Sequence, residues 1–115
     1  MFYLIRHGQT DWNLFRRFNG VTETCLNQTG IEQAKRQAKA LDGIKFDMCF
    51  CSPQRRAIQT GEILYKGKMI LDGRLAEIIC GEFEGMEENK ASMELFWQVK
   101  VQLRNATRNG LKKER

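Results

Sequence analysis

The sequence contains very little histidine or proline, with one of each, His7 and Pro53, among 115 residues. No apolar run approaches the length of a membrane-spanning helix, and Arg6 interrupts the N-terminal apolar run too early for a secretory signal peptide. The four cysteines form no C-x-x-C pair, and a single histidine excludes the usual Cys/His zinc patterns. We therefore expect one soluble cytoplasmic domain with reduced thiols, no metal and no membrane contact.

Positive charge is in excess, but only locally. The formal net charge is +5, and because basic and acidic residues cancel over 1–98, the whole excess lies in residues 99–115. A nucleic-acid-binding module would more often combine such charge with exposed aromatic residues or a docking element. We interpret 1–97 as the domain and 98–115 as a solvated basic segment, and we expect no nucleic-acid partner. Binding of that segment to a polynucleotide or an anionic surface stays open as an alternative.

Apolar periodicity divides the first 97 residues into alternating strands and helices. The expected elements are a buried strand over 2–5, a helix over 29–41, a strand over 45–52, a helix over 53–65, a short strand over 69–71 and a helix from 92. A long loop or short helical turn fills residues 8–28. This alternation is typical of an α/β fold with parallel strand pairing.

Capping signals predict where the helices begin. Thr29 and Glu32 match the T-x-x-E capping box, and Ser52 before Pro53 supplies an N-cap followed by a proline at the first helical position. The last helix would present four apolar residues on one face: Met93, Phe96, Val99 and Leu103.

Cationic residues follow the ends of two predicted parallel strands, which is where open sheets bind ligands. The first strand leads into Arg6, His7 and Gly8, and the second leads into a helix whose first turn carries Arg55 and Arg56. Arginine forks and a helix N-terminus both favour phosphate, and a glycine lets the backbone approach it closely. A neutral histidine in such a site can attack a phosphoryl group and hold it covalently.

A leaving alcohol in that reaction needs a proton from a carboxylic acid. The loop after Arg74 offers three candidates, Glu77, Glu82 and Glu84, and their spacing leaves open which one serves. Taken singly, a histidine near a strand end, paired arginines and a glutamate-rich loop are more often structural or solvated. Their combination at two strand ends favours a phosphate site.

Four sequence blocks together resemble the histidine phosphatase superfamily, also called the phosphoglycerate mutase-like family. The first is "LIRHGQTDWN", and the helical block "LNQTGIEQAKRQAKAL" follows it. The block "CSPQRRAIQTGEIL" is similar to the family's S-S-P-L-x-R-A-x-Q-T-A motif, and "RLAEIICGEFEG" to its L-x-E-x-x-x-G-x-W/F-E-G element. The blocks occur in family order across roughly residues 1–97, which makes the resemblance specific.

The resemblance implies a fold and a role for several positions. The fold would be a three-layer αβα domain with a mostly parallel central sheet. His7 corresponds to the phosphorylated nucleophile, Arg6 and Arg56 to phosphate-binding arginines, and Asn13 to an asparagine of the phosphate pocket. Glu77 matches the proton donor better than the two later glutamates. The family uses arginines and histidines rather than a metal or another cofactor.

The chain also departs from the family pattern. Gln54 stands where the second block usually has leucine, and no histidine follows His7, although family members carry a second catalytic histidine on a later strand beside the first. We therefore expect the N-terminal part of a family domain, C-terminally incomplete. Its first strand would have an open edge through which copies could associate.

Two functions are compatible with these residues. One is a phosphatase or phosphomutase that acts through phosphohistidine. We expect this activity to be weak or lost because the second histidine is absent, and the second block favours a phosphatase over a glycolytic mutase. The other is a catalytically impaired domain that still binds a small phosphorylated metabolite. Sugar phosphates, phosphoglycerates and α-ribazole phosphate all remain open as substrates.

Overall fold

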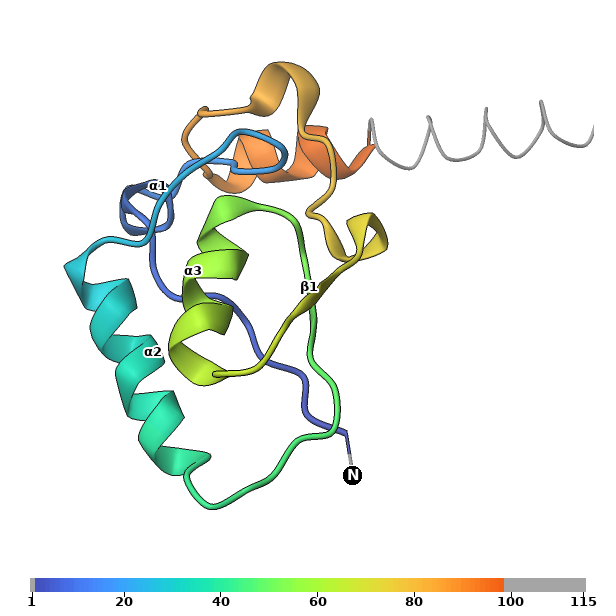
Figure 1. The fold of residues 1–115 in the computed structure, drawn as a ribbon. Helices are drawn as coiled ribbons and strands as arrows, with labels where there is room; N and C mark the ends of the chain where they lie inside the picture. The colour runs from blue at the N-terminus through green and yellow to red at the C-terminus, as the bar shows by residue number, and fades with distance from the viewer. Residues whose placement is uncertain (1, 99–115) are drawn as a thin grey trace, which may run out of the picture.

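The computed structural model describes residues 2–98. Figure 1 shows the order of elements along the chain. The α-helices are α1 (Asp11–Leu14), α2 (Gln28–Ala40) and α3 (Arg55–Leu64), the strands are β1 (Phe50–Cys51) and β2 (Ile70–Leu71), and the 3₁₀ helices are η1 (Gly73–Leu75) and η2 (Gly81–Phe83). Residues 90–98 are also helical.

The two strands confirm the predicted parallel pairing. Phe50 lies opposite Ile70 and Cys51 opposite Leu71 in a parallel register, and α3 forms the connection between them. Helices α2 and α3 pack against each other, and α3 also packs on β1 (Figure 1). The α/β class is therefore confirmed, and the short strand predicted over 69–71 is present as β2.

The prediction of a strand over 2–5 is wrong, since none of these positions takes part in strand pairing among the described residues. Phe2 and Leu4 are 86% and 85% exposed, so the apolar run that suggested burial lies at the surface. A strand forms only when a neighbouring backbone supplies hydrogen bonds, and β1 is bonded to β2. For the same reason the strand predicted over 45–52 shortens to two residues.

Both predicted helix starts are also shifted. Asn27, not Thr29, is the N-cap of α2, because its side-chain oxygen accepts a hydrogen bond of 2.8 Å from the Gly30 N–H. Helix α3 begins two residues after Pro53, with Gln54 as an N-cap in extended conformation that makes no side-chain capping bond. Its amide is instead bonded to two other parts of the chain, as described below.

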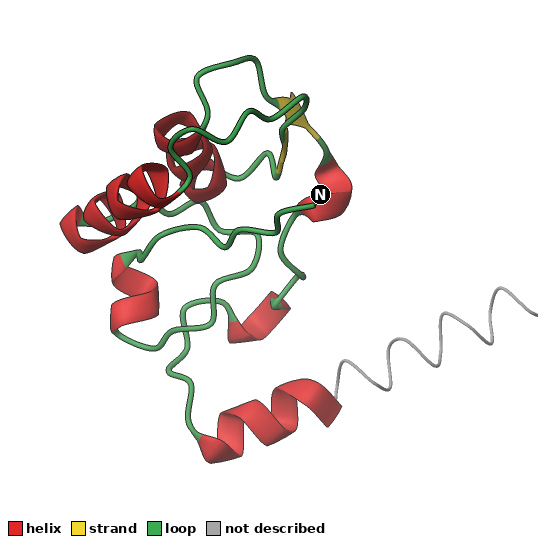
Figure 2. Ribbon diagram, turned by 90° about the horizontal axis from the view of Figure 1, so that it is seen from below, coloured by secondary structure: helices red, strands yellow, loops and turns green. Residues whose placement is uncertain are grey.

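An aromatic cluster forms the core beside the last helix. The rings of Phe18, Phe83 and Phe96 lie with centroids 4.9–5.6 Å apart, and Met93 packs against them. This confirms the buried face predicted for the last helix at Met93 and Phe96, whereas Val99 and Leu103 fall outside the described residues. The helix over 90–98 is separated from α2 and α3 by loop segments (Figure 2). No helix among residues 2–98 is both long and apolar enough to cross a bilayer.

Candidate functional site

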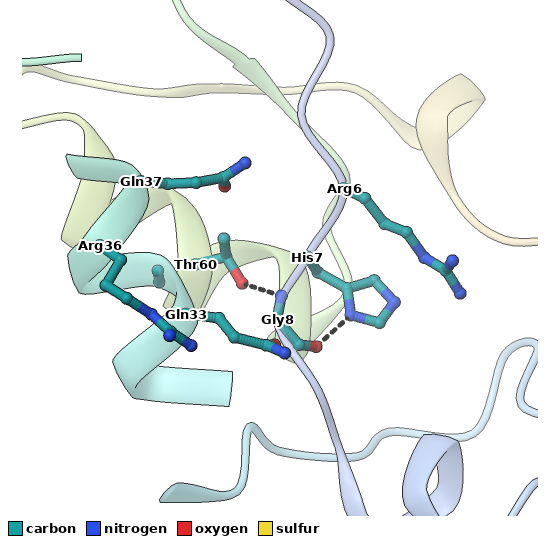
Figure 3. Close-up of a pocket in the computed structure, with 8 residues that line it drawn as sticks. Arg6, His7, Gly8, Gln33, Arg36, Gln37 and Thr60 are labelled. Carbon is teal, nitrogen blue, oxygen red and sulfur yellow. Dashed lines mark hydrogen bonds between the residues drawn. The ribbon is translucent and has the colours of Figure 1, made fainter. Parts of the chain in front are cut away.

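The His7 side chain is held in one tautomer by the backbone next to it. Its Nδ1 lies 2.6 Å from the Gly8 carbonyl oxygen, as Figure 3 shows. A carbonyl oxygen only accepts hydrogen bonds, so Nδ1 carries the proton and Nε2 keeps its lone pair. The ring is half-buried. This leaves one ring nitrogen able to act as a nucleophile.

The segment that carries His7 is clamped between α2 and α3. The Gly8 N–H donates to Thr60 Oγ1 at 3.0 Å, and that hydroxyl donates to the Arg56 carbonyl at 2.8 Å. On the other side, a β-carbon at position 8 would overlap the Gly30 backbone of α2. Glycine is therefore required by close packing, and its N–H is already occupied by Thr60.

Arg56 is a buried cation without a carboxylate partner at ion-pair distance among residues 2–98. Its side chain is 1% exposed, and its guanidinium donates to the carbonyls of Thr22 and Gly20 at 3.1 and 2.8 Å. Burial lowers the pKa of Arg56, while the more distant carboxylates of Glu77, Glu23 and Glu84 act in the opposite direction. A buried guanidinium of this kind favours binding of an anion.

The residues predicted as catalytic influence one another electrostatically. Burial is the main cause that lowers the pKa of His7 below its ordinary value of 6.5, and the charges of Arg56 and Arg6 lower it further. The hydrogen bond with the Gly8 backbone and the Glu77 carboxylate act in the opposite direction. The charges of Arg6, Arg56 and Glu77 thus all act on the His7 ring, although Arg56 and Glu77 lie far from it in the sequence.

The structure separates the roles of the three candidate glutamates. The Glu84 carboxylate accepts from the backbone N–H groups of Gly20 and Thr22 at 2.9–3.0 Å, so it fixes that loop. Glu77 is exposed, and its carboxylate accepts from the Ile78 N–H at 3.1 Å. The Glu77 carboxylate also acts on the pKa of His7, and a role for Glu77 as the proton donor stays a prediction.

Asn13 and the Arg55 backbone have hydrogen-bond partners within the described chain. The Asn13 side-chain oxygen accepts from the N–H and the hydroxyl of Thr10, each at 3.0 Å, and this closes the capping box of α1. A phosphate-binding role for Asn13 stays a prediction. The Arg55 N–H donates to a Glu23 carboxylate oxygen at 2.9 Å, so this end of α3 is tied to the preceding loop.

A pocket of about 370 Å³ adjoins the histidine. The N-terminal segment contributes Arg6, His7 and Gly8 to it, and four residues of α2 together with Thr60 of α3 complete the lining (Figure 3). The α2 residues are Gln33, Ala34, Arg36 and Gln37. Sequence reasoning did not identify these residues. The spacing of Gln33 and Gln37, one helical turn apart, was the available signal for a polar face.

Comparison with known proteins places these features in a family. Residues 2–111 match the family model described as "Histidine phosphatase superfamily (branch 1)". A 2,3-bisphosphoglycerate-dependent phosphoglycerate mutase of Rhizobium meliloti (strain 1021) is 38% identical over 96 residues, which are 76% of this chain and 46% of that protein.

Solved structures are also similar to a large part of this chain. The phosphoserine phosphatase of Entamoeba histolytica in complex with 3-phosphoglyceric acid is 34% identical with a TM-score of 0.66, and covers 70% of this chain and 41% of the other. A mycobacterial glucosyl-3-phosphoglycerate phosphatase is 32% identical with a TM-score of 0.68, covering 71% and 42%.

The chain spans less than half the length of these relatives, and it matches mutases and phosphatases at similar identity. The match to the family model covers nearly the whole chain and includes all the residues of the histidine site. This chain belongs to the histidine phosphatase superfamily, branch 1.

Proposed function

We propose that this chain transfers the phosphoryl group of a small phosphomonoester through a phosphohistidine at His7. The observation that carries the proposal is the hydrogen bond of 2.6 Å from Nδ1 to the Gly8 carbonyl, because it leaves the Nε2 lone pair free beside two arginines. Membership of a family that contains phosphatases and phosphoglycerate mutases supports phosphoryl transfer in general.

In the first step, His7 Nε2 attacks phosphorus and the bond from phosphorus to the ester oxygen breaks. The Glu77 carboxylic acid gives its proton to the leaving alkoxide, while the guanidinium groups of Arg6 and Arg56 neutralise the phosphoryl oxygens. In the second step water attacks the phosphohistidine and returns a proton to Glu77. Inorganic phosphate leaves, and His7 is again neutral. In a mutase, a substrate hydroxyl would replace the water.

The rate of this reaction should be low, since the sequence has no second histidine to bind the transferring group. Loss of one preorganised charge-stabilising donor costs on the order of 2.7–4 kcal/mol in the barrier, by analogy with an oxyanion hole. The alternative function is binding of a phosphorylated metabolite without turnover. The buried guanidinium of Arg56 favours this alternative, since it attracts an anion whether or not His7 reacts. A cytoplasmic location and the absence of metal and nucleic-acid partners stay predictions.

Intact-mass measurement after incubation with two phosphoryl donors tests the proposal. Acetyl phosphate has a leaving group that needs no proton, whereas 3-phosphoglycerate releases an alkoxide. We expect an acid-labile phosphoryl adduct on the wild type with both donors and no adduct on His7→Ala. Glu77→Gln should retain the adduct from acetyl phosphate and lose that from 3-phosphoglycerate, because only the second reaction needs its proton.

An adduct on His7→Ala would contradict the assignment of the nucleophile, since the chain has no other histidine. A folded wild type that forms no adduct but binds 3-phosphoglycerate would favour the binding function. Its binding should then weaken in Arg6→Ala, which removes an exposed cation without opening the core.

A further inference from the structure

Gln54 makes a set of hydrogen bonds that no catalytic assignment uses. The side chain is 8% exposed, and its Nε2 donates to the Gly20 carbonyl at 2.6 Å. Its Oε1 accepts from the Glu77 N–H at 2.9 Å and from the Ser52 hydroxyl at 3.3 Å. One buried amide therefore connects the start of α3 to two loops that come from distant parts of the sequence.

The bond from Gln54 reaches Glu77 in a segment without regular secondary structure. Residues 77–80, between η1 and η2, belong to no helix or strand. Within residues 2–98 the Glu77 carboxylate accepts a hydrogen bond from the adjacent Ile78 N–H alone, and this bond fixes its position relative to Ile78 but not to His7. Among the interactions described for Glu77, the bond to Gln54 is the hydrogen bond that crosses to another element.

The same amide is also linked to the phosphate-site arginine. The Gly20 carbonyl accepts from Gln54 Nε2 and from Arg56 Nη2, at 2.6 and 2.8 Å. Gln54 and Arg56 thus share an acceptor. The amide nitrogen of Gln54 donates to the Gly20 loop, to which Arg56 also donates, and the amide oxygen of Gln54 accepts from Glu77. A leucine of similar size would fill the space but make neither bond.

We propose that Gln54 is a positioning residue that fixes the Glu77 backbone and so holds the Glu77 carboxylate in place relative to His7. The role of Glu77 as proton donor rests on the proposed function, but the positioning itself does not. Gln54 touches neither a reacting atom nor His7 in the described contacts, so it acts through Glu77.

NMR titration of His7 tests this positioning, because the only histidine of a tag-free chain gives an unambiguous ring signal. Three charged groups act on its pKa: Arg6, Arg56 and Glu77. Glu77→Gln should lower the pKa of His7 in the wild-type background. In a Gln54→Leu background the same substitution should produce no further shift, because the carboxylate is no longer held near the ring.

Gln59→Leu is the matched control. Gln59 lies on α3, and its Oε1 accepts from the Leu26 N–H at 2.8 Å, so it also fixes a loop backbone but not that of Glu77. Glu77→Gln should shift the pKa of His7 in the Gln59→Leu background as it does in the wild type. Amide exchange gives a second readout: Gln54→Leu should remove protection of the Glu77 N–H, and Gln59→Leu that of the Leu26 N–H.

The proposal is overturned if Glu77→Gln shifts the pKa of His7 equally with and without Gln54, or leaves it unchanged in the wild type. It is also overturned if the Glu77 N–H stays protected in Gln54→Leu. Should Gln54→Leu not fold, Gln54→Asn, whose shorter amide cannot span both partners, takes its place with the same expected loss of coupling. None of these measurements requires a phosphoryl donor. Failure to trap a phosphohistidine would therefore count against the proposed function but not against the positioning role of Gln54.

Discussion

Burial of His7 ties its protonation to the stability of the fold. Its pKa in the native state lies below the ordinary value of 6.5, mainly because burial disfavours the imidazolium and then because Arg56 and Arg6 repel it. Between the native and unfolded pKa values the unfolded chain binds more protons, so stability increases with pH in that interval. The contribution is complete above pH 6.5 and is lost as the pH falls through the native pKa.

The first prediction follows from this increase of stability with pH. The free energy of unfolding of the wild type should decrease more between about pH 7.5 and about pH 5 than that of His7→Asn, which has no ring to protonate. Urea denaturation of both proteins at the two pH values measures the difference. Equal decreases would mean that the native pKa of His7 is not lowered.

A second prediction concerns the packing of Gly8 against Gly30. Gly8→Ala would force its β-carbon into the Gly30 backbone, and overpacking of this kind typically costs ~1–3 kcal/mol. Gly73→Ala is the control, since no atom lies within 4 Å of the position of its β-carbon. Urea midpoints should decrease for the first variant and remain near the wild-type value for the second. Equal midpoints would show that the two segments are farther apart than described.

At the scale of secondary-structure elements, the start of α2 is a place where the sequence pattern and the structure disagree. The Asn27 side chain accepts from the Gly30 N–H and donates to Gln9 Oε1 at 3.0 Å, so it caps the helix and also binds the segment after Gly8. Thr29 is exposed and lies inside the helix. The capping box predicted from Thr29 and Glu32 is therefore replaced by a cap two residues earlier.

The third prediction distinguishes the two caps. Asn27→Ala should lower the free energy of unfolding by about 0.5–2 kcal/mol, the usual effect of removing an N-cap. Thr29→Ala should leave it nearly unchanged, because alanine is at least as favourable inside a helix. Thermal unfolding of the two variants measures both effects. A larger loss of unfolding free energy for Thr29→Ala would mean that Thr29, as predicted from the sequence, is the N-cap.

At the scale of the whole molecule, the N-terminal segment combines unpaired backbone with exposed apolar side chains. Residues 2–5 form no strand pairing, and Phe2 and Leu4 are almost fully exposed. Phe50 of β1 is also 55% exposed. Unpaired backbone beside exposed apolar side chains is a template for pairing with another chain. We propose that copies of this chain associate through this segment.

The fourth prediction tests that association by sedimentation velocity over a range of concentrations. Leu4→Lys should reduce self-association, because charged side chains on an exposed segment oppose pairing. Phe15→Lys is the control, since Phe15 is also highly exposed but follows α1 rather than lying in the segment. A monomeric wild type, or equal reduction by both variants, would contradict the role of this segment.

The sequence by itself determined the α/β class, the two long helices and the residue types of the site. Periodicity placed α2 and α3 to within two residues at each end, because one apolar face per helix is a local property of the chain. The motif around His7, and the arginine and glutamate blocks, predicted the phosphate chemistry because each block is short and continuous.

Only the tertiary structure decided which of these residues meet and how each is held. The spacing of the glutamates could not separate Glu77 from Glu84, and only the family resemblance favoured Glu77; the bonds that Glu84 makes to a loop some sixty residues away are seen only in the structure. Nor could it assign Gln54, whose partners Gly20 and Glu77 come from both sides of it in sequence. The run over 2–5 was predicted as a strand for the same reason: apolar pattern is local, whereas strand formation requires a neighbouring backbone that only the folded chain can supply.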